Sequence, residues 1–162
     1  MGNIFSGSEI VEIAIQIEKN GKDFYREVSN CSQNENSKKV FDYLMEAEDE
    51  HIESFTKLLS SVQNYEPAEA YPGEYFSYMK ALADDHIFTK PGTGCDIGKK
   101  VSSDTEAIDM GIGFEEASIK FYEEMKKAVP EKDHAMLDAL IKTEKKHLNE
   151  LGELKQLLQK GE

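Results

Sequence analysis

Apolar residues recur along the chain at alternating steps of three and four positions, which is the period of an amphipathic helix. Four segments have this pattern, at roughly residues 8–30, 37–63, 104–129 and 131–159. No segment alternates apolar and polar residues in the manner of a half-buried strand. The sequence therefore predicts an all-α protein with four long helices.

Cap and turn signals agree with these boundaries. Ser6 with Glu9, and Ser103 with Glu106, have the spacing of capping boxes at the starts of the first and third helices. Pro130 separates the third helix from the fourth, because proline cannot continue a helix that precedes it.

The connections between the helices predict how they are arranged. The first two helices and the last two are each joined by a few residues, so they should form antiparallel hairpins at about residues 8–63 and 104–159. The connection between the hairpins, residues 64–103, is long enough to run the length of a bundle and return the chain to the opposite end. We expect residues 1–162 to form one domain, a four-helix bundle with a long crossover.

The crossover itself is expected to contain one short helix, at about residues 74–86. That helix places four residues on one side: Tyr75, Tyr78, Met79 and Leu82. The following stretch, Lys90–Lys100, contains one proline and three glycines, which favours an irregular loop. It does not match a phosphate-binding loop, because Gly92 and Gly98 enclose five residues where that motif has four.

The inward face of each long helix is an apolar stripe that a glutamate interrupts near mid-length. A histidine follows the glutamate three positions later in the second and fourth helices, on the same face. Because the glutamates lie at similar distances from the ends of similar helices, their carboxylates should meet at one level of the bundle. The six interrupting residues are Glu18, Glu48, His51, Glu115, Glu144 and His147.

The two halves of the chain repeat this pattern in register, which indicates an internal duplication. Each residue of the first half has its counterpart 96 or 97 positions later: Glu18 and Glu115, Tyr25 and Tyr122, Glu48 and Glu144, His51 and His147. The register also selects Glu115 over its neighbour Glu116, because only Glu115 aligns with Glu18.

Four carboxylates inside an apolar bundle would repel one another unless protons or cations neutralise them. Two divalent metal ions would cancel four negative charges. A ligand set rich in oxygen, with one imidazole for each metal, suits iron or manganese, and zinc could also occupy it. We therefore predict that the six residues bind two metal ions, although a bundle without metal is the structural alternative.

Other polar residues near the predicted site have competing explanations. Tyr25 and Tyr122 lie two turns from Glu18 and Glu115, so their hydroxyls could touch the site, but core packing is the commoner role of such aromatic residues. The small Gly21 and Ser118 stand where the other helices carry histidines, which would leave room for water, peroxide or dioxygen, or simply allow close helix packing. Residues off the inward faces are assigned to the surface or to loops: Glu46, Glu50, Glu116, Glu123, His86 and His134.

Composition narrows the functional classes. The chain has 32 acidic against 19 basic residues and a formal charge of -13, so nucleic acid is not expected as a partner. Cys31 and Cys95 are far apart and form no CxxC motif, which fits a reducing cytoplasm and no thiolate metal site. The start MGNIFS fits a myristoylation pattern, but Ser6 is explained as a helix cap and no basic patch follows. With no long apolar run, we expect no membrane association and no export.

The residues around the six candidates resemble the rubrerythrin branch of the ferritin-like di-iron proteins. The similarity lies in IEKNGKDFY around Glu18, FEEASIKFY around Glu115, and the EDEH and EKKH motifs of the other two helices. This resemblance implies a ferritin-like bundle with two iron ions. It further implies that Glu48 and Glu144 are terminal ligands, that Glu18 and Glu115 bridge or adapt, and that each histidine completes one iron.

Two departures from that family pattern affect the expected function. Rubrerythrins usually have another glutamate where this chain has Ser118. Full-length members also end in a rubredoxin domain with paired CxxC motifs, whereas this chain has no CxxC motif. The resemblance implies reduction of hydrogen peroxide to water with an external electron donor such as a rubredoxin, and a homodimer. The alternative is a ferroxidase that oxidises ferrous iron with oxygen, which the symmetric site with Ser118 favours.

Overall fold

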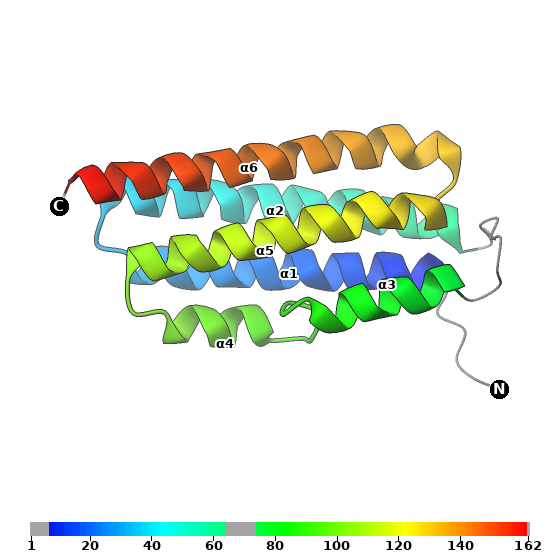
Figure 1. Ribbon diagram of the computed structural model, residues 1–162, viewed down its shortest axis with the longest axis horizontal. Helices are drawn as coiled ribbons and strands as arrows, with labels where there is room; N and C mark the ends of the chain where they lie inside the picture. Colours follow the sequence, from blue (N-terminus) through cyan, green and yellow to red (C-terminus); the bar gives the residue numbers. More distant parts are fainter. Residues whose placement is uncertain (1–6, 64–73, 162) are drawn as a thin grey trace.

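The computed structural model describes residues 7–63 and 74–161, and its main feature is a bundle of four long helices (Figure 1). These helices are α1 (Gly7–Cys31), α2 (Glu35–Val62), α5 (Asp104–Met125) and α6 (His134–Lys160). The described part contains no strand, and the prediction of an all-α bundle is confirmed.

The helices are connected as two hairpins and a crossover. Helices α1 and α2 are antiparallel neighbours, as are α5 and α6, whereas α2 and α5 run in the same direction (Figure 1). The chain therefore leaves α2 at one end of the bundle and enters α5 at the other. This is the topology that the length of the connection predicted.

Polar caps and one proline set the helix boundaries. Asn34 caps α2 by accepting a hydrogen bond from the Ser37 amide at 2.9 Å, and Ser103 caps α5 by accepting from the Glu106 amide at 3.1 Å. Before Pro130 the backbone of Val129 is extended, so α5 ends in the short 3₁₀ turn Lys126–Ala128, and the turn Glu131–Asp133 leads into α6. The predicted cap Ser6 and the MGNIFS segment lie outside the described residues.

Two short helices of the crossover lie along one side of the bundle (Figure 1). The first, α3 (Glu74–Asp85), was predicted, and its Met79 is buried, but Tyr78 is 44% exposed and does not belong to the packed side. The second, α4 (Thr93–Lys100), falls in the stretch predicted to be an irregular loop, and that prediction was wrong.

The glycines of α4 explain why the segment is helical. Gly92, at φ 81°, takes the left-handed conformation that starts the helix, while Gly94 lies directly against α1. A Cβ atom at position 94 would come within 1.9 Å of the Asn20 carbonyl oxygen. Glycine therefore serves here to let two helices approach closely, a tertiary effect that outweighs its low helix propensity.

The inward faces predicted from the three-four period form the core. All their residues are buried except Leu158, which is half-buried near the end of α6. The largest fully buried side chains include Tyr25, Tyr122 and Phe114, around the level of the glutamates. None of the described helices combines the length and the apolar character that crossing a lipid bilayer requires.

Candidate metal centre

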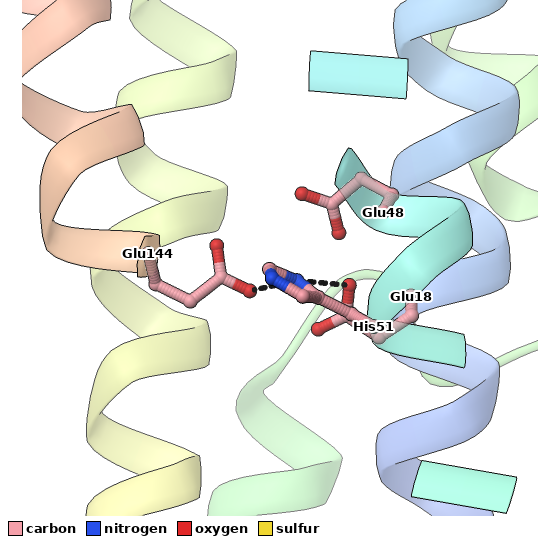
Figure 2. Close-up of side chains that lie close together, drawn as sticks. All are labelled: Glu18, Glu48, His51 and Glu144. Atoms are coloured by element: carbon pink, nitrogen blue, oxygen red, sulfur yellow. Dashed lines mark ion pairs between the residues drawn. The ribbon is translucent and has the colours of Figure 1, made fainter. Parts of the chain in front are cut away.

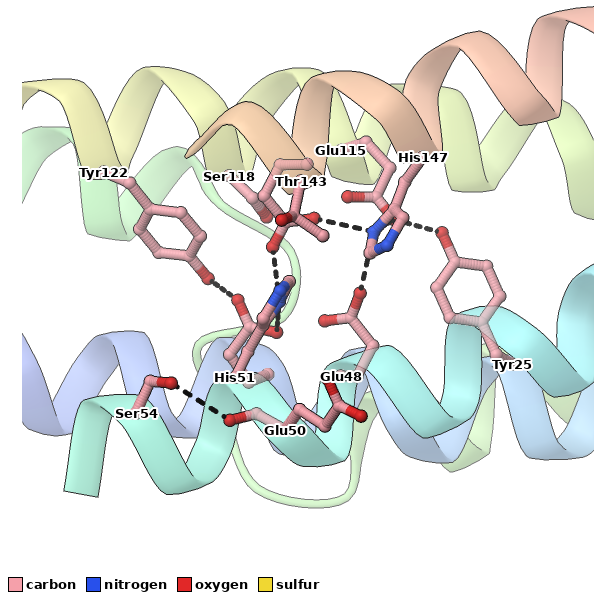
Figure 3. A network of polar contacts seen from close by, with 12 residues as sticks. Tyr25, Glu48, Glu50, His51, Ser54, Glu115, Ser118, Tyr122, Thr143 and His147 are labelled. Carbon is pink, nitrogen blue, oxygen red and sulfur yellow. Dashed lines mark hydrogen bonds and ion pairs between the residues drawn. The ribbon is translucent and has the colours of Figure 1, made fainter. Parts of the chain in front are cut away.

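The four long helices bring all six predicted residues to one level inside the bundle, where each is almost completely shielded from solvent. Exposure is 6% for His51 and 0% for the other five. Figure 2 shows Glu18 from α1, Glu48 and His51 from α2, and Glu144 from α6 converging, and Figure 3 adds Glu115 and His147. The spacing of the residues along the helices thus produced the cluster that the sequence predicted.

The cluster consists of two overlapping groups, in each of which the potential ligand atoms lie within 4.8 Å of one another. One group is Glu18, Glu48, His51 and Glu144, and the other is Glu48, Glu115, Glu144 and His147. Each group has one histidine and three carboxylates. A pair of metal ions would therefore receive one imidazole each and share two glutamates.

The residues common to both groups are Glu48 and Glu144, whereas the resemblance implies that Glu18 and Glu115 bridge. Glu144 lies between the histidines, with Oε1 3.0 Å from His51 Nδ1 and Oε2 3.0 Å from His147 Nδ1. By contrast, Glu18 and Glu115 each belong to a single group. The arrangement favours Glu48 and Glu144 as bridging ligands and the other two glutamates as terminal ones.

The buried oxygen and nitrogen atoms of the cluster are better suited to bind a pair of metal ions than to form hydrogen bonds with one another. Buried polar groups are normally hydrogen-bonded. Here several buried atoms of the cluster have no hydrogen-bond partner among the described residues: Glu18 Oε2, both Glu48 oxygens, His51 Nδ1, Glu115 Oε2, Glu144 Oε1 and His147 Nε2. Oxygens and imidazole nitrogens left open in this way are the donors that iron or manganese prefers.

Without metal, protons must balance the charges, and His51 holds one of them. Burial lowers the pKa of His51, but the nearby carboxylates of Glu18 and Glu144 outweigh burial and raise it to about 11. For Glu18, burial opposes ionisation, yet the protonated Glu48 carboxyl group beside it and the positive charge of His51 lower its pKa to about 2. The metal-free state thus contains a buried His51–Glu18 ion pair, with 3.4 Å between Nδ1 and Oε2.

The other members of the cluster are pushed toward their neutral forms. Burial, followed by repulsion from neighbouring glutamates, raises the pKa of Glu48 and Glu115 well above the usual value. Burial and the charge of Glu18 raise the pKa of Glu144, while burial lowers that of His147. Binding of divalent cations would replace the protons that these carboxyl groups retain.

Two tyrosines are hydrogen-bonded to Glu18 and Glu115, so their contact with the site is more than core packing. The Tyr25 hydroxyl on α1 donates to Glu115 Oε1 on α5 at 2.7 Å, and the Tyr122 hydroxyl on α5 donates to Glu18 on α1 (Figure 3). Burial, then the charge of the partner glutamate, raises the pKa of each hydroxyl well above its usual value. Both tyrosines therefore remain protonated donors.

Gly21 and Ser118 do not leave the space that their small size had indicated. A Cβ atom on Gly21 would lie 2.6 Å from Cζ of Phe114, so an aromatic ring fills that side of the cluster. Ser118 Oγ lies 3.1 Å from Nε2 of His86. The close-packing alternative explains Gly21, and a polar contact from the crossover explains Ser118.

His86 lies in a loop, which is one of the two placements predicted for it, but its burial near the site was not predicted. It follows α3 in the crossover but is only 4% exposed, and burial lowers its pKa to about 4. Nothing in the helical periodicity could assign it, because it lies outside the four long helices. Asn20, which is fully buried on α1, was also missed, although a polar residue two positions after the candidate ligand Glu18 was a weak signal.

The remaining expectations about polar residues hold in the described part. The side chains of Glu46, Glu50, Glu116 and Glu123 are exposed. His134 is half-buried at the start of α6, with Nε2 2.9 Å from the Lys126 carbonyl oxygen. Cys31 and Cys95 are free thiols, as their spacing predicted.

Comparison with known proteins agrees with this fold and cluster. A Thermotoga maritima protein, assigned by its description to the ferritin-like diiron-carboxylate proteins, has a crystal structure that matches with a TM-score of 0.72 and 29% sequence identity. The match covers 96% of this chain and 98% of that one. No curated protein shows a significant match.

The fold and the buried Glu/His cluster place the protein in the ferritin-like diiron-carboxylate class. The sequence model of the Rubrerythrin family matches residues 9–155, which include all six residues of the cluster. The chain belongs to the rubrerythrin family.

Proposed function

We propose that the protein is a di-iron oxidoreductase that reduces hydrogen peroxide to water. The observation that carries the proposal is the pair of overlapping Glu/His groups that share Glu48 and Glu144, in a member of the rubrerythrin family. Two ferrous ions held by the six residues would supply the two electrons that cleavage of the O–O bond requires.

The chain's own residues would hold and orient this centre. The two histidines direct Nδ1 toward the carboxylates, and Glu144 lies between them. Tyr25 and Tyr122 keep their protons and fix the carboxylates of Glu115 and Glu18 by hydrogen bonds. The apolar core above and below the cluster excludes bulk water, which strengthens electrostatic interactions within it.

Reduction of the centre after each turnover requires an electron donor, and we propose an external one such as a rubredoxin. The two cysteines of the chain are separate free thiols and form no CxxC pair that could hold a second iron site. We further propose that the protein works as a homodimer in the cytoplasm. Light scattering of the purified protein tests the dimer.

Anaerobic loading with ferrous iron, followed by stopped-flow mixing with peroxide or with oxygen, tests the reaction. Much faster oxidation by peroxide, at about one peroxide per pair of metal ions, is the expected result. Metal analysis of protein purified without added metal tests whether iron, manganese or zinc is bound. Binding of less than one metal ion per chain, with no change in Glu48→Ala, would contradict the proposal.

A second candidate is a ferroxidase that oxidises ferrous iron with oxygen and stores or passes on the product. Ser118 favours it, because a serine replaces the additional glutamate of rubrerythrins and leaves three carboxylates around each metal position. If oxygen oxidised the ferrous protein as fast as peroxide, or faster, the same experiment would support this function instead. Storage also requires a cage of many subunits, which light scattering would detect.

A further inference from the structure

The buried side chain of Asn20 on α1 forms hydrogen bonds with the crossover beside the metal centre. Asn20, two residues after the ligand Glu18, donates from Nδ2 to the carbonyl oxygens of Phe88 and Lys90, and its Oδ1 accepts from the Gly94 amide at 3.1 Å. The side chain thus uses both donors and its acceptor on the crossover. These three contacts fix the backbone at Phe88 and in the residues that follow it, up to Gly94.

The backbone fixed in this way determines the protonation of His86. The Phe88 amide donates to Nδ1 of His86 at 3.1 Å, so Nδ1 must be the unprotonated nitrogen. Since burial keeps this imidazole neutral, its proton resides on Nε2. His86 Nε2–H can therefore only donate in its 3.1 Å contact with Ser118 Oγ.

The same contact determines what the Ser118 hydroxyl can do. Ser118 is fully buried on the inward face of α5, one turn after Glu115 and one turn before Tyr122. Its oxygen accepts from His86, and its own proton has no acceptor among the hydrogen bonds of the described residues. The hydroxyl proton remains available to a group at the centre, near which Ser118 lies in Figure 3.

We propose that His86 and Ser118 form a neutral hydrogen-bond donor site for a small anion or oxygen ligand at the metal centre. This inference rests on the proposed function, since it requires metal ions in the six-residue cluster. At this position rubrerythrins place a carboxylate, which can bind metal but repels an anion. A serine that a neutral histidine orients as a donor stabilises negative charge instead. His86 acts through Ser118 and is a positioning residue.

Azide is a suitable probe, because it is a small anion whose binding to ferric iron is followed by absorption. The protein would be loaded with iron, oxidised and titrated with azide. Ser118→Ala should weaken azide binding by about tenfold or more, which is the effect of losing one hydrogen bond to a charged acceptor. His86→Phe, which keeps an aromatic ring but no donor, should weaken it similarly.

Matched controls are Ser29→Ala and His134→Phe, which change the same residue types at opposite ends of the bundle. Neither control should alter azide affinity, and all four variants should bind as much iron as the original protein. Unchanged azide affinity in Ser118→Ala at full iron content would overturn the inference and leave the proposed function standing. A protein that binds no metal would overturn both.

A second measurement does not depend on metal. Nitrogen-15 NMR of the metal-free protein should find the His86 proton on Nε2 and none on Nδ1. Ser118→Ala should shift the Nε2–H resonance of His86 and leave that of His134 unchanged. A proton on Nδ1 would contradict the donor arrangement, whatever the metal content of the protein.

Discussion

The hydroxyl of Tyr25 on α1 donates a hydrogen bond to Oε1 of Glu115 on α5, across the interior of the bundle at 2.7 Å. The reciprocal bond joins Tyr122 on α5 to Glu18 on α1. Each half of the duplicated chain thus holds a candidate metal ligand of the other half. Because both tyrosines are fully buried, these bonds connect the hairpins at the level of the cluster itself.

Tyr25→Phe should lower the free energy of unfolding by about 1–2 kcal/mol, because Glu115 loses the donor that satisfies it in a buried position. Urea denaturation of the metal-free protein measures this change. Tyr43→Phe is the matched control. Because Tyr43 is 40% exposed, loss of its hydroxyl should lower the free energy of unfolding by less than about 0.5 kcal/mol. Equal effects of the two substitutions would contradict the structural role of the Tyr25 bond.

Glu48→Gln should reduce metal content more than Glu18→Gln. Glu48 belongs to both ligand groups and Glu18 to one, so the first substitution weakens both metal positions and the second only one. Metal analysis after equilibration with ferrous iron measures the difference. The exposed Glu46 provides the control, and Glu46→Gln should leave the metal content unchanged. A greater loss of metal from Glu18→Gln than from Glu48→Gln would instead indicate that Glu48 is a terminal ligand.

The metal-free protein should become less stable as pH rises above neutrality. The raised pKa of His51, about 11 against 6.5 for an unperturbed histidine, contributes stability that is complete below 6.5 and lost as pH rises toward 11. The raised pKa values of Glu48 and Glu115 act in the same direction above 4.5. For each proton that the folded state retains and the unfolded state has released, the free energy of unfolding falls by about 1.4 kcal/mol per pH unit.

Groups with lowered pKa values oppose this trend only at lower pH. The contribution of Glu18 grows between about 2 and 4.5, and that of His86 between about 4 and 6.5, so both are complete near neutrality. Urea denaturation at pH 7.5 and at about 9.5 should therefore give a clear decrease for the original protein. His51→Gln should show a shallower decrease. Stability that rises over this interval would refute the charge assignment.

Gly94→Ala should destabilise the protein strongly. The new Cβ atom would meet the backbone of Asn20 within 1.9 Å, so α4 and α1 would have to separate and the Asn20 hydrogen bonds would weaken. We expect a loss of about 3 kcal/mol or more, together with faster proteolysis in the crossover.

Gly113→Ala is the control for this substitution, because position 113 lies in α5 with open space around it. Alanine there should stabilise the protein by about 0.5–1 kcal/mol through helix propensity. Thermal or urea unfolding of both variants measures the contrast. If Gly94→Ala were as stable as Gly113→Ala, the close approach of α4 to α1 would be wrong.

The sequence was sufficient to predict the bundle and the six clustered residues, because both depend on periodicity. An apolar stripe determines which face of a helix is buried, so a glutamate such as Glu18 within the stripe must be buried too. The similar distance of each glutamate from the end of its helix predicted their common level, and the duplication selected Glu115 as the counterpart of Glu18. That these residues bind metal remains a prediction.

The crossover could not be predicted in the same way, because its structure depends on contacts with other parts of the chain. The glycines of α4 have low helix propensity, and only the nearby backbone of Asn20 explains Gly94. Likewise, the burial of His86 results from a segment that packs against α1 and α5, a contact with no periodic signal in the sequence. The sequence also could not show that Glu48 and Glu144 belong to both ligand groups, because that depends on distances among side-chain atoms.

The packing of the crossover also bears on how the two halves of the chain diverged. Two identical hairpins assembled around one axis would form equal surroundings for both metal positions, with the counterparts Gly21 and Ser118 alike. In the present chain Phe114 covers Gly21, whereas His86 contacts Ser118. If the chain arose by fusion of such hairpins, the segment that joined them introduced the part of this asymmetry that His86 provides. A linker of this kind can change the surroundings of one metal position in a duplicated site while the metal-ligand residues stay the same.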